Sequence, residues 1–206
     1  EGTGVIAKTA KQIKAKLVYI STDYVFDGLG QECHSEDKKT KPVNYYGYTK
    51  EQGEIIVREL LDNYFIIRTS WVYGSNGNNF VKTMLKLAET KNEISVVSDQ
   101  IGAPTYTKDL AEFITELVQT KQYGTYHGVN EGYCSWYEFA KTIFEKSGIE
   151  VKVNPISTKD YPTKAKRPLN SRLTKENTDN AGVSRLPQWQ DALTRFINNL
   201  NNEKRG

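Results

Sequence analysis

Short apolar runs alternate along the chain with longer segments in which apolar residues recur every three or four positions. The runs carry many β-branched and aromatic residues and predict strands at 16–22, 64–70, 94–97, 125–129 and 151–156. The helical spacing predicts helices at 1–14, 45–61, 80–90, 107–119, 135–147 and 186–200. Strands that alternate with helices are typical of a parallel α/β sheet, so we expect an α/β fold of that kind.

Local signals sharpen the ends of several predicted helices. Ser135 is followed three positions later by Glu138, which predicts a capping box, and Gly148 predicts the end of the same helix. Thr107 predicts an N-cap for the helix after it. The segment 154–173 holds three of the six prolines and predicts an irregular connection.

The character of the chain changes near Asn130, which indicates two regions. We expect a catalytic core over 1–130 and a smaller, substrate-binding lobe over 131–185, to which residues 75–105 of the core also contribute. A closing helix is expected over 186–206. The chain begins without methionine, inside a predicted helix. We therefore expect that a part of the fold lies upstream of this sequence.

Composition narrows the class of protein. Of the 206 residues, 37% are hydrophobic and 26% are charged, as in ordinary globular proteins. The net charge of +3 is too balanced for a nucleic-acid partner, and no apolar run approaches the ~18 residues of a membrane span. Two cysteines and no visible signal peptide fit a cytoplasmic protein. Neither the cysteines nor the two histidines form a pattern that predicts a metal site.

Tyr46 and Lys50 are the first candidates for chemistry. Residues four positions apart share one face of a helix. An ammonium beside a phenol stabilises the phenolate, and a phenol tuned in this way can exchange a proton with a substrate oxygen near neutral pH. Taken alone, the pair more often describes a surface tyrosine beside a lysine.

Two predicted strands end in polar residues that belong near this pair. One strand ends in Ser21-Thr22-Asp23, and the next ends in Arg68-Thr69-Ser70-Trp71. Ligands of parallel sheets bind at the carboxyl ends of the strands, so these hydroxyls should face one crevice. A hydroxyl, a phenol and an ammonium around a carbonyl would polarise it and deliver a proton, and a reduced nicotinamide would deliver the hydride.

Long motifs extend this set. They are Ser21-Thr22-Asp23-Tyr24-Val25-Phe26-Asp27-Gly28, Pro42-x-Asn44-x-Tyr46-Gly47-x-Thr49-Lys50-x-x-Gly53-Glu54, Arg68-Thr69-Ser70-Trp71-Val72-Tyr73-Gly74, Asp99-Gln100-x-Gly102-x-Pro104-Thr105, Gly132-x-Cys134-Ser135-Trp136-Tyr137-Glu138-Phe139-Ala140 and Arg167-Pro168-x-Asn170-Ser171. In this order they resemble the dTDP-4-dehydrorhamnose reductase family of the extended short-chain dehydrogenases/reductases. The resemblance implies a Rossmann-like, doubly wound core and the reduction of the 4-keto group of a nucleotide-linked deoxysugar by NADPH or NADH.

The resemblance also implies a role for each matching residue. Thr22 would hydrogen-bond the sugar carbonyl oxygen, Tyr46 would donate the proton, and Lys50 would make that phenol more acidic and hold the cofactor ribose. Asp23 would assist at the same strand end. Other cofactor contacts would come from Ser21, Arg68, Thr69 and Ser70. Substrate contacts would come from Trp71, Gln100, Gly102, Pro104, Thr105, Arg167 and Asn170, with Arg167 on the diphosphate.

Several of these residues have a structural alternative. Arg68 suits a buried ion pair, Trp71 suits a core position, and Arg167 belongs to a basic run over 159–175 that could be simply solvated. The segment with Gln100, Gly102, Pro104 and Thr105 could equally be a plain turn.

The sequence leaves two other functions open. It also resembles the regulatory subunit of methionine adenosyltransferase, which is a binding partner and not a reductase. A nucleotide-sugar epimerase or dehydratase is the third candidate. A dehydratase normally needs an added pair of carboxylates beside the threonine, whereas Thr22 is followed by one aspartate, Asp23, and then by Tyr24.

One part of the family pattern has no counterpart in this sequence. Family members begin with a strand and a Gly-x-x-Gly-x-x-Gly loop that cradles the cofactor pyrophosphate, and roughly the first third of the pattern is unmatched here. The residue that reads the ribose 2′ position would lie there too. The choice between NADH and NADPH, any Mg²⁺ requirement, the oligomeric state and turnover by this chain alone are therefore left open.

Overall fold

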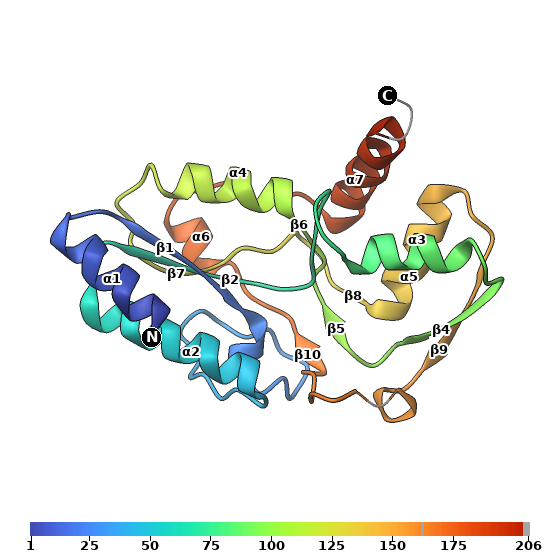
Figure 1. Cartoon of the computed structure of the whole chain (residues 1–206), viewed down its shortest axis with the longest axis horizontal. Coiled ribbons are helices and arrows are strands. Elements are labelled where there is room, and N and C mark those ends of the chain that lie inside the picture. The colour runs from blue at the N-terminus through green and yellow to red at the C-terminus, as the bar shows by residue number, and fades with distance from the viewer. Residues whose placement is uncertain (162, 204–206) are drawn as a thin grey trace.

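The computed structural model describes residues 1–161 and 163–203, and its largest sheet is parallel, as predicted (Figure 1). Its strands are β1 (Leu17–Thr22), β2 (Tyr64–Thr69) and β7 (Gly124–His127), in the order β1-β2-β7. In the register, Ser21 lies opposite Arg68 and Thr22 opposite Thr69. The polar ends of β1 and β2 therefore lie side by side, as the sequence predicts.

Helices lie on both sides of this sheet. Figure 1 shows α1 (Gly2–Gln12) and α2 (Tyr45–Leu60) below it and α4 (Thr107–Leu117) above it, and the short α6 (Glu176–Asn180) contacts β7. Asn44 caps α2, because its side-chain oxygen accepts a hydrogen bond of 2.8 Å from the backbone N–H of Gly47. This cap fixes the start of the helix that carries Tyr46.

The second region is built around an apolar cluster rather than a wide sheet. It contains α3 (Phe80–Ala88), α5 (Trp136–Ser147), α7 (Trp189–Glu203) and the parallel pair β4 (Glu93–Val97) and β9 (Lys152–Ile156). The fully buried members of its core are Val81, Phe139, Ala140, Ile143, Ala192, Leu193 and Phe196. The helix that closes the chain thus packs into the core of this region.

Short strands lie between the sheet and this second region. β3 (Val72–Tyr73) pairs with β6 (Thr105–Tyr106), and β5 (Ile101–Gly102) lies between β8 (Cys134–Ser135) and β10 (Asn170–Ser171). Two turns of 3-10 helix, η1 (Asp23–Val25) and η2 (Thr158–Asp160), follow β1 and β9. β10 therefore brings the late part of the chain beside the middle part.

The predicted helix ends are partly confirmed. The capping box of Ser135 and Glu138 is present, and Gly148 ends α5 with a left-handed φ of 65°. The Thr107 cap was wrong: Tyr106 is the N-cap of α4 and makes no side-chain cap bond. Tyr106 holds that position because its strand β6 runs directly into the helix.

The segment 154–173 is more regular than its prolines suggest. It holds the end of β9, η2 and β10, because each of these pairs with or packs against a distant part of the chain. Position 162 of this segment and positions 204–206 of the predicted closing helix lie outside the described residues. Among the residues described, no helix has the length and apolar character needed to cross a membrane.

Candidate active site

The ends of β1 and β2 bring four hydroxyl groups together. Ser21, Thr22, Thr69 and Ser70 are all buried. Ser70 is anchored, because its Oγ donates a hydrogen bond of 2.8 Å to the carbonyl oxygen of Ala103. The Oγ1 of Thr69 is buried and has no hydrogen-bond partner in residues 1–161 and 163–203. A buried hydroxyl of this kind is suited to a ligand that reaches the strand end.

Asp23 joins Thr22 in a small hydrogen-bonded group. The Thr22 hydroxyl donates to Oδ1 of Asp23 over 3.0 Å, and the Ser171 hydroxyl donates to Oδ2 over 2.5 Å. The backbone N–H of Tyr24 donates to Thr22 Oγ1 over 3.3 Å. Burial raises the pKa of Asp23 to about 6, although the hydrogen bonds from Ser171 and Thr22 oppose that rise. Asp23 therefore holds its proton more tightly than an ordinary aspartate does.

Two glycines let α2 approach this strand end. A Cβ atom on Gly47 would overlap the carbonyl oxygen of Tyr24, and one on Gly53 would overlap the hydroxyl of Tyr19. Larger residues at these two positions would push the helix away from β1. Tyr46 consequently lies next to η1, with its ring edge-on to Tyr24 at a centroid distance of 5.7 Å and its side chain 54% exposed.

Lys50 lies one helical turn further along α2. Its ammonium donates to the carbonyl oxygen of Ile20 and lies 4.3 Å from the centroid of the Tyr19 ring. Burial lowers the pKa of Lys50, and the charge of Glu54 opposes that shift. Lys50 thus shares the helix face of Tyr46, while its closest contacts are with β1.

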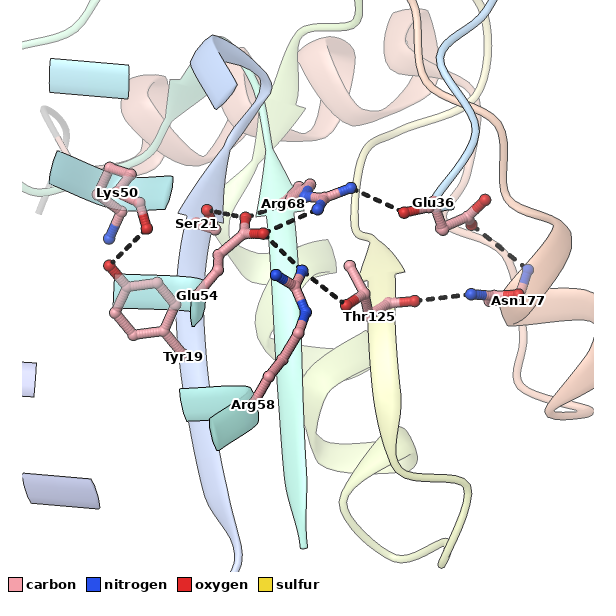
Figure 2. Close-up of polar contacts among 9 residues, drawn as sticks. All are labelled: Tyr19, Ser21, Glu36, Lys50, Glu54, Arg58, Arg68, Thr125 and Asn177. Atoms are coloured by element: carbon pink, nitrogen blue, oxygen red, sulfur yellow. Dashed lines mark hydrogen bonds and ion pairs between the residues drawn. The ribbon is translucent and has the colours of Figure 1, made fainter. Parts of the chain in front are cut away.

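The interior beneath the site is charged (Figure 2). Arg68 donates from Nε and Nη2 to the two carboxylate oxygens of Glu54, over 2.9 and 2.8 Å, and from Nη1 to the carbonyl oxygen of Glu36 over 3.0 Å. Ser21 and Arg58 also donate to Glu54. Burial opposes ionisation of Glu54, but these partners hold its pKa below the usual range.

This network bears on the cofactor role that the sequence predicts for Arg68. The side chain is 2% exposed and all three guanidinium nitrogens are engaged, so few of its atoms are left for a cofactor. Its position is the structural alternative, a buried ion pair. Ser21 is likewise directed to Glu54, at 2.5 Å. Glu54 was not among the predicted site residues, although it belongs to the motif that carries Tyr46 and Lys50.

Trp71 connects the end of β2 to the second region. Its indole stacks on Trp136 at a centroid distance of 3.6 Å and an interplanar angle of 11°. It also covers Gly102, where an added Cβ would lie 2.8 Å from the indole ring. The backbone of Trp71 has a φ of 48°, a conformation that L-residues other than Asn, Asp and Gly seldom adopt. The stacked, half-buried ring therefore sits between the strand end and the lobe.

A cavity of about 400 Å³ opens on the lobe side of Trp136. Its wall is mainly apolar and comes from α3 and β4, and its polar groups include Gln100, Thr163 and Arg167. Gln100 is buried and its amide donates to Thr158 over 3.1 Å, whereas Arg167 is exposed. The cavity thus combines an apolar wall with one guanidinium at its edge.

The segment that contains Arg167 also contacts the start of α2. Asn44, the N-cap of α2, donates from its side chain to the carbonyl oxygen of Lys166 over 2.8 Å. Burial raises the pKa of Tyr24, the charge of Asp23 adds to this, and the charge of Arg167 opposes it. Arg167 therefore contributes positive charge at Tyr24. The sequence reasoning missed Tyr24 as a site residue, even though it stands inside the first motif.

The other predicted substrate residues take more internal positions. Pro104 and Thr105 are buried at the start of β6, and Thr105 Oγ1 donates to the carbonyl oxygen of Ala103 over 3.3 Å. Asn170 is 2% exposed; its amide donates to the Glu32 carbonyl over 2.8 Å and its oxygen accepts from Arg172 over 3.0 Å. These contacts favour a structural role for Asn170 and Thr105.

A second cavity, of about 480 Å³, lies on the α2 side of β7. Its lining is polar and includes Glu36, Lys38, Arg58, Thr125 and Asn177, and it contains neither Thr22 nor Tyr46. Its larger volume, compared with about 400 Å³ beside Trp136, does not make it the active site. The hydroxyls and the phenol instead mark the ends of β1 and β2 as the place where carbonyl chemistry is possible.

Comparison with known proteins shows the family of this chain. The family model of the RmlD substrate binding domain matches residues 1–202. The spore coat polysaccharide biosynthesis protein SpsK of Bacillus subtilis is 47% identical over 196 residues, which are 95% of this chain and 69% of that protein. The dTDP-4-dehydrorhamnose reductase of Escherichia coli K12 is 41% identical over 206 residues, with 95% and 69% of the two chains covered.

A solved structure gives the same result. The dTDP-4-dehydrorhamnose reductase of Bacillus anthracis, crystallised in complex with NADP, superimposes with a TM-score of 0.94 at 47% identity and covers 96% of this chain and 70% of that one. The chain belongs to the dTDP-4-dehydrorhamnose reductase family, within the extended short-chain dehydrogenases/reductases. The Rossmann-like fold expected from the motifs is thereby confirmed.

Proposed function

We propose that this protein is a nicotinamide-dependent oxidoreductase that reduces the 4-keto group of dTDP-4-dehydro-L-rhamnose to give dTDP-L-rhamnose. The observation that carries the proposal is the packing of the Tyr46 helix against Tyr24, which follows Thr22 at the carboxyl end of β1, in a chain that belongs to this reductase family. The product is an activated sugar, which fits a relative that makes spore coat polysaccharide.

The residues at the strand ends suit the reduction of a carbonyl. Thr22 would hydrogen-bond the sugar carbonyl oxygen, and Tyr46, whose phenol is accessible, would protonate the oxygen as it becomes an alkoxide. Lys50 supplies a positive charge on the same helix face. Burial favours loss of the Lys50 proton, whereas an anion close to the ammonium would favour its charged form.

The same strand ends suit the reactive end of a nicotinamide cofactor. The hydroxyl of Thr69, which has no partner among the described residues, lies where β2 ends, opposite Thr22, and would serve as a cofactor contact together with Ser70 and Lys50. The bound cofactor would supply the hydride. NADPH is the first donor to test, because the Bacillus anthracis relative was crystallised with NADP.

The cavity beside Trp136 is our proposed site for the nucleotide part of the substrate. Its apolar wall suits the flat face of a base, and the guanidinium of Arg167 suits a diphosphate, which it can bind through two parallel N–H donors. Trp71 and Gln100 would border the sugar between this cavity and Thr22. We propose that the protein acts in the cytoplasm; its described cysteines, Cys33 and Cys134, are free thiols, as a reducing compartment requires.

Following NADPH oxidation in the presence of dTDP-4-dehydro-L-rhamnose tests the proposal. We expect steady oxidation that depends on the sugar nucleotide and a product that co-elutes with dTDP-L-rhamnose. NADH in place of NADPH measures the cofactor preference, and chelation followed by addition of Mg²⁺ measures any metal requirement. Tight binding of the cofactor without turnover, in a mixture that increases methionine adenosyltransferase activity, would favour the regulatory-subunit alternative instead.

A further inference from the structure

One hydrogen bond ties the late part of the chain to the catalytic strand end. Ser171 in β10 donates to Oδ2 of Asp23 over 2.5 Å, across 148 positions of sequence. Ser171 is 2% exposed and Asp23 is 3% exposed, so water does not compete freely for this contact. The other carboxyl oxygen of Asp23 accepts from Thr22 over 3.0 Å. A single carboxyl group therefore connects Ser171 to the threonine proposed to contact substrate.

The neighbours of β10 show where in the molecule this hydrogen bond lies. Ser171 pairs with Gly102 in β5, and Gly102 lies directly under the indole of Trp71. Four positions before Ser171 stands Arg167, which lines the nucleotide cavity. The strand that holds Ser171 is thus fixed between the proposed substrate cavity and the end of β1.

We infer that Ser171 is a positioning residue that fixes the place of the Thr22 Oγ1 atom through the carboxyl group of Asp23. This inference rests on the proposed reduction. The Thr22 hydroxyl has one proton, so a bound sugar carbonyl would take that hydrogen bond in place of Asp23. The carboxyl torsion of an aspartate is broad and has no deep preference of its own, so its two oxygens are oriented by their partners. Ser171 holds Oδ2, which turns Oδ1 toward Thr22.

Loss of the Ser171 hydroxyl would leave a buried carboxyl oxygen without its donor. Such a group is costly to leave unsatisfied, so the carboxyl would rotate toward the donors that remain. The backbone N–H groups of Asp23 and Tyr24 are such donors. Thr22 would then lose the partner that holds its Oγ1 atom in place, while the nucleotide cavity would keep its lining residues.

Steady-state kinetics of Ser171→Ala test this role. We expect kcat to fall about 10-fold, because small errors of alignment at a reacting centre have effects of this order, with KM for the sugar nucleotide within about 2-fold. Ser171→Thr keeps a hydroxyl and should recover most of kcat. Thr178→Ala is the control: Thr178 is 1% exposed, its hydroxyl has no partner in the described part of the chain, and it lies in α6. Its kcat should stay at the wild-type value.

A second measurement does not need turnover. Carbon-13 NMR of the aspartate carboxyl groups, with Asp23 assigned by Asp23→Asn, follows the titration of this residue. Ser171→Ala removes a hydrogen bond that favours the charged form, so the Asp23 pKa should move upward from about 6. An unchanged titration would overturn the inference even if the proposed reaction failed. In an active enzyme, a kcat of Ser171→Ala equal to that of Thr178→Ala, or a loss confined to KM, would overturn it as well.

Discussion

The sheet region and the lobe region bury different kinds of side chain. Beneath the ends of β1 and β2 the interior contains Glu54, Arg68, Glu36 and His127, all at most 5% exposed. The lobe interior around α5 and α7 is apolar and aromatic, with Phe139 and Phe196 fully buried. Polar groups at the edge of the lobe, such as Gln100 and Arg167, border its cavity instead.

This difference separates two ways of building a site. In the sheet region, charged pairs fix the strands and the helix that hold reactive groups, and their burial leaves little freedom to rearrange. In the lobe, apolar packing fixes the backbone and leaves the cavity wall suited to a flat ligand. Changes in the sheet region should therefore affect stability and kcat, while changes at the lobe edge should affect substrate affinity.

The largest effect is expected at Tyr46. Tyr46→Phe removes the proton donor and keeps the ring that packs against Tyr24, so kcat should fall by ~10²–10⁴, the usual worth of general acid catalysis, while KM changes less. Tyr45→Phe is the matched control, since Tyr45 is the neighbouring residue on α2 and is 79% exposed. Steady-state kinetics check this, and a Tyr46→Phe enzyme with nearly wild-type kcat would remove Tyr46 from the mechanism.

The next largest effect is expected at Glu54. Glu54→Gln keeps the shape of the side chain but leaves the buried guanidinium of Arg68 without a negative partner, which should cost ~3–5 kcal/mol of unfolding free energy. The same change at Glu93, whose ion pair with Lys152 is exposed, should have little effect. Urea unfolding of both variants makes the comparison. Equal losses at the two positions would contradict a special role for buried charge in the sheet region.

Asp23 gives the sheet region a pH dependence. Its pKa is raised to about 6 in the folded protein, so the folded state binds the proton more tightly than the unfolded chain does. The contribution of Asp23 to unfolding free energy should therefore decrease as pH rises from about 4 to about 6, by up to roughly 3 kcal/mol. Stability curves of wild type and Asp23→Asn should differ in slope over this window. Parallel curves would show that folding does not change the pKa of Asp23.

The smallest of these effects is expected at the lobe edge. Arg167→Ala should weaken binding of the sugar nucleotide and of free dTDP alike, by ~1.5–3 kcal/mol for a charge-assisted bond, and leave NADPH affinity and stability unchanged. Lys164→Ala is the control, since Lys164 belongs to the same basic run but does not line the cavity. Calorimetric titrations of both variants with the sugar nucleotide, dTDP and NADPH measure these affinities. An equal loss for NADPH and dTDP would place Arg167 outside the nucleotide site.

The amino-acid sequence by itself determined the local architecture and the chemistry. Apolar periodicity predicted β1, β2, α2 and α5 to within one residue or so, because a strand or helix is selected mainly by residues a few positions apart. The capping box at Ser135 was visible for the same reason. The six ordered motifs, among them the one with Tyr46 and Lys50, predicted the reductase family, because each motif is a run of residues close in sequence.

Only the tertiary structure decided which distant residues support that chemistry. The contacts of Arg68 with Glu54, of Asn44 with Lys166 and of Ser171 with Asp23 join positions 14, 122 and 148 apart. No local pattern encodes such pairs, since each depends on how strands and loops are brought together when the apolar clusters pack. The neighbours of Arg68 in sequence left both a cofactor contact and a buried ion pair open. Its burial beside Glu54 made it an ion-pair partner.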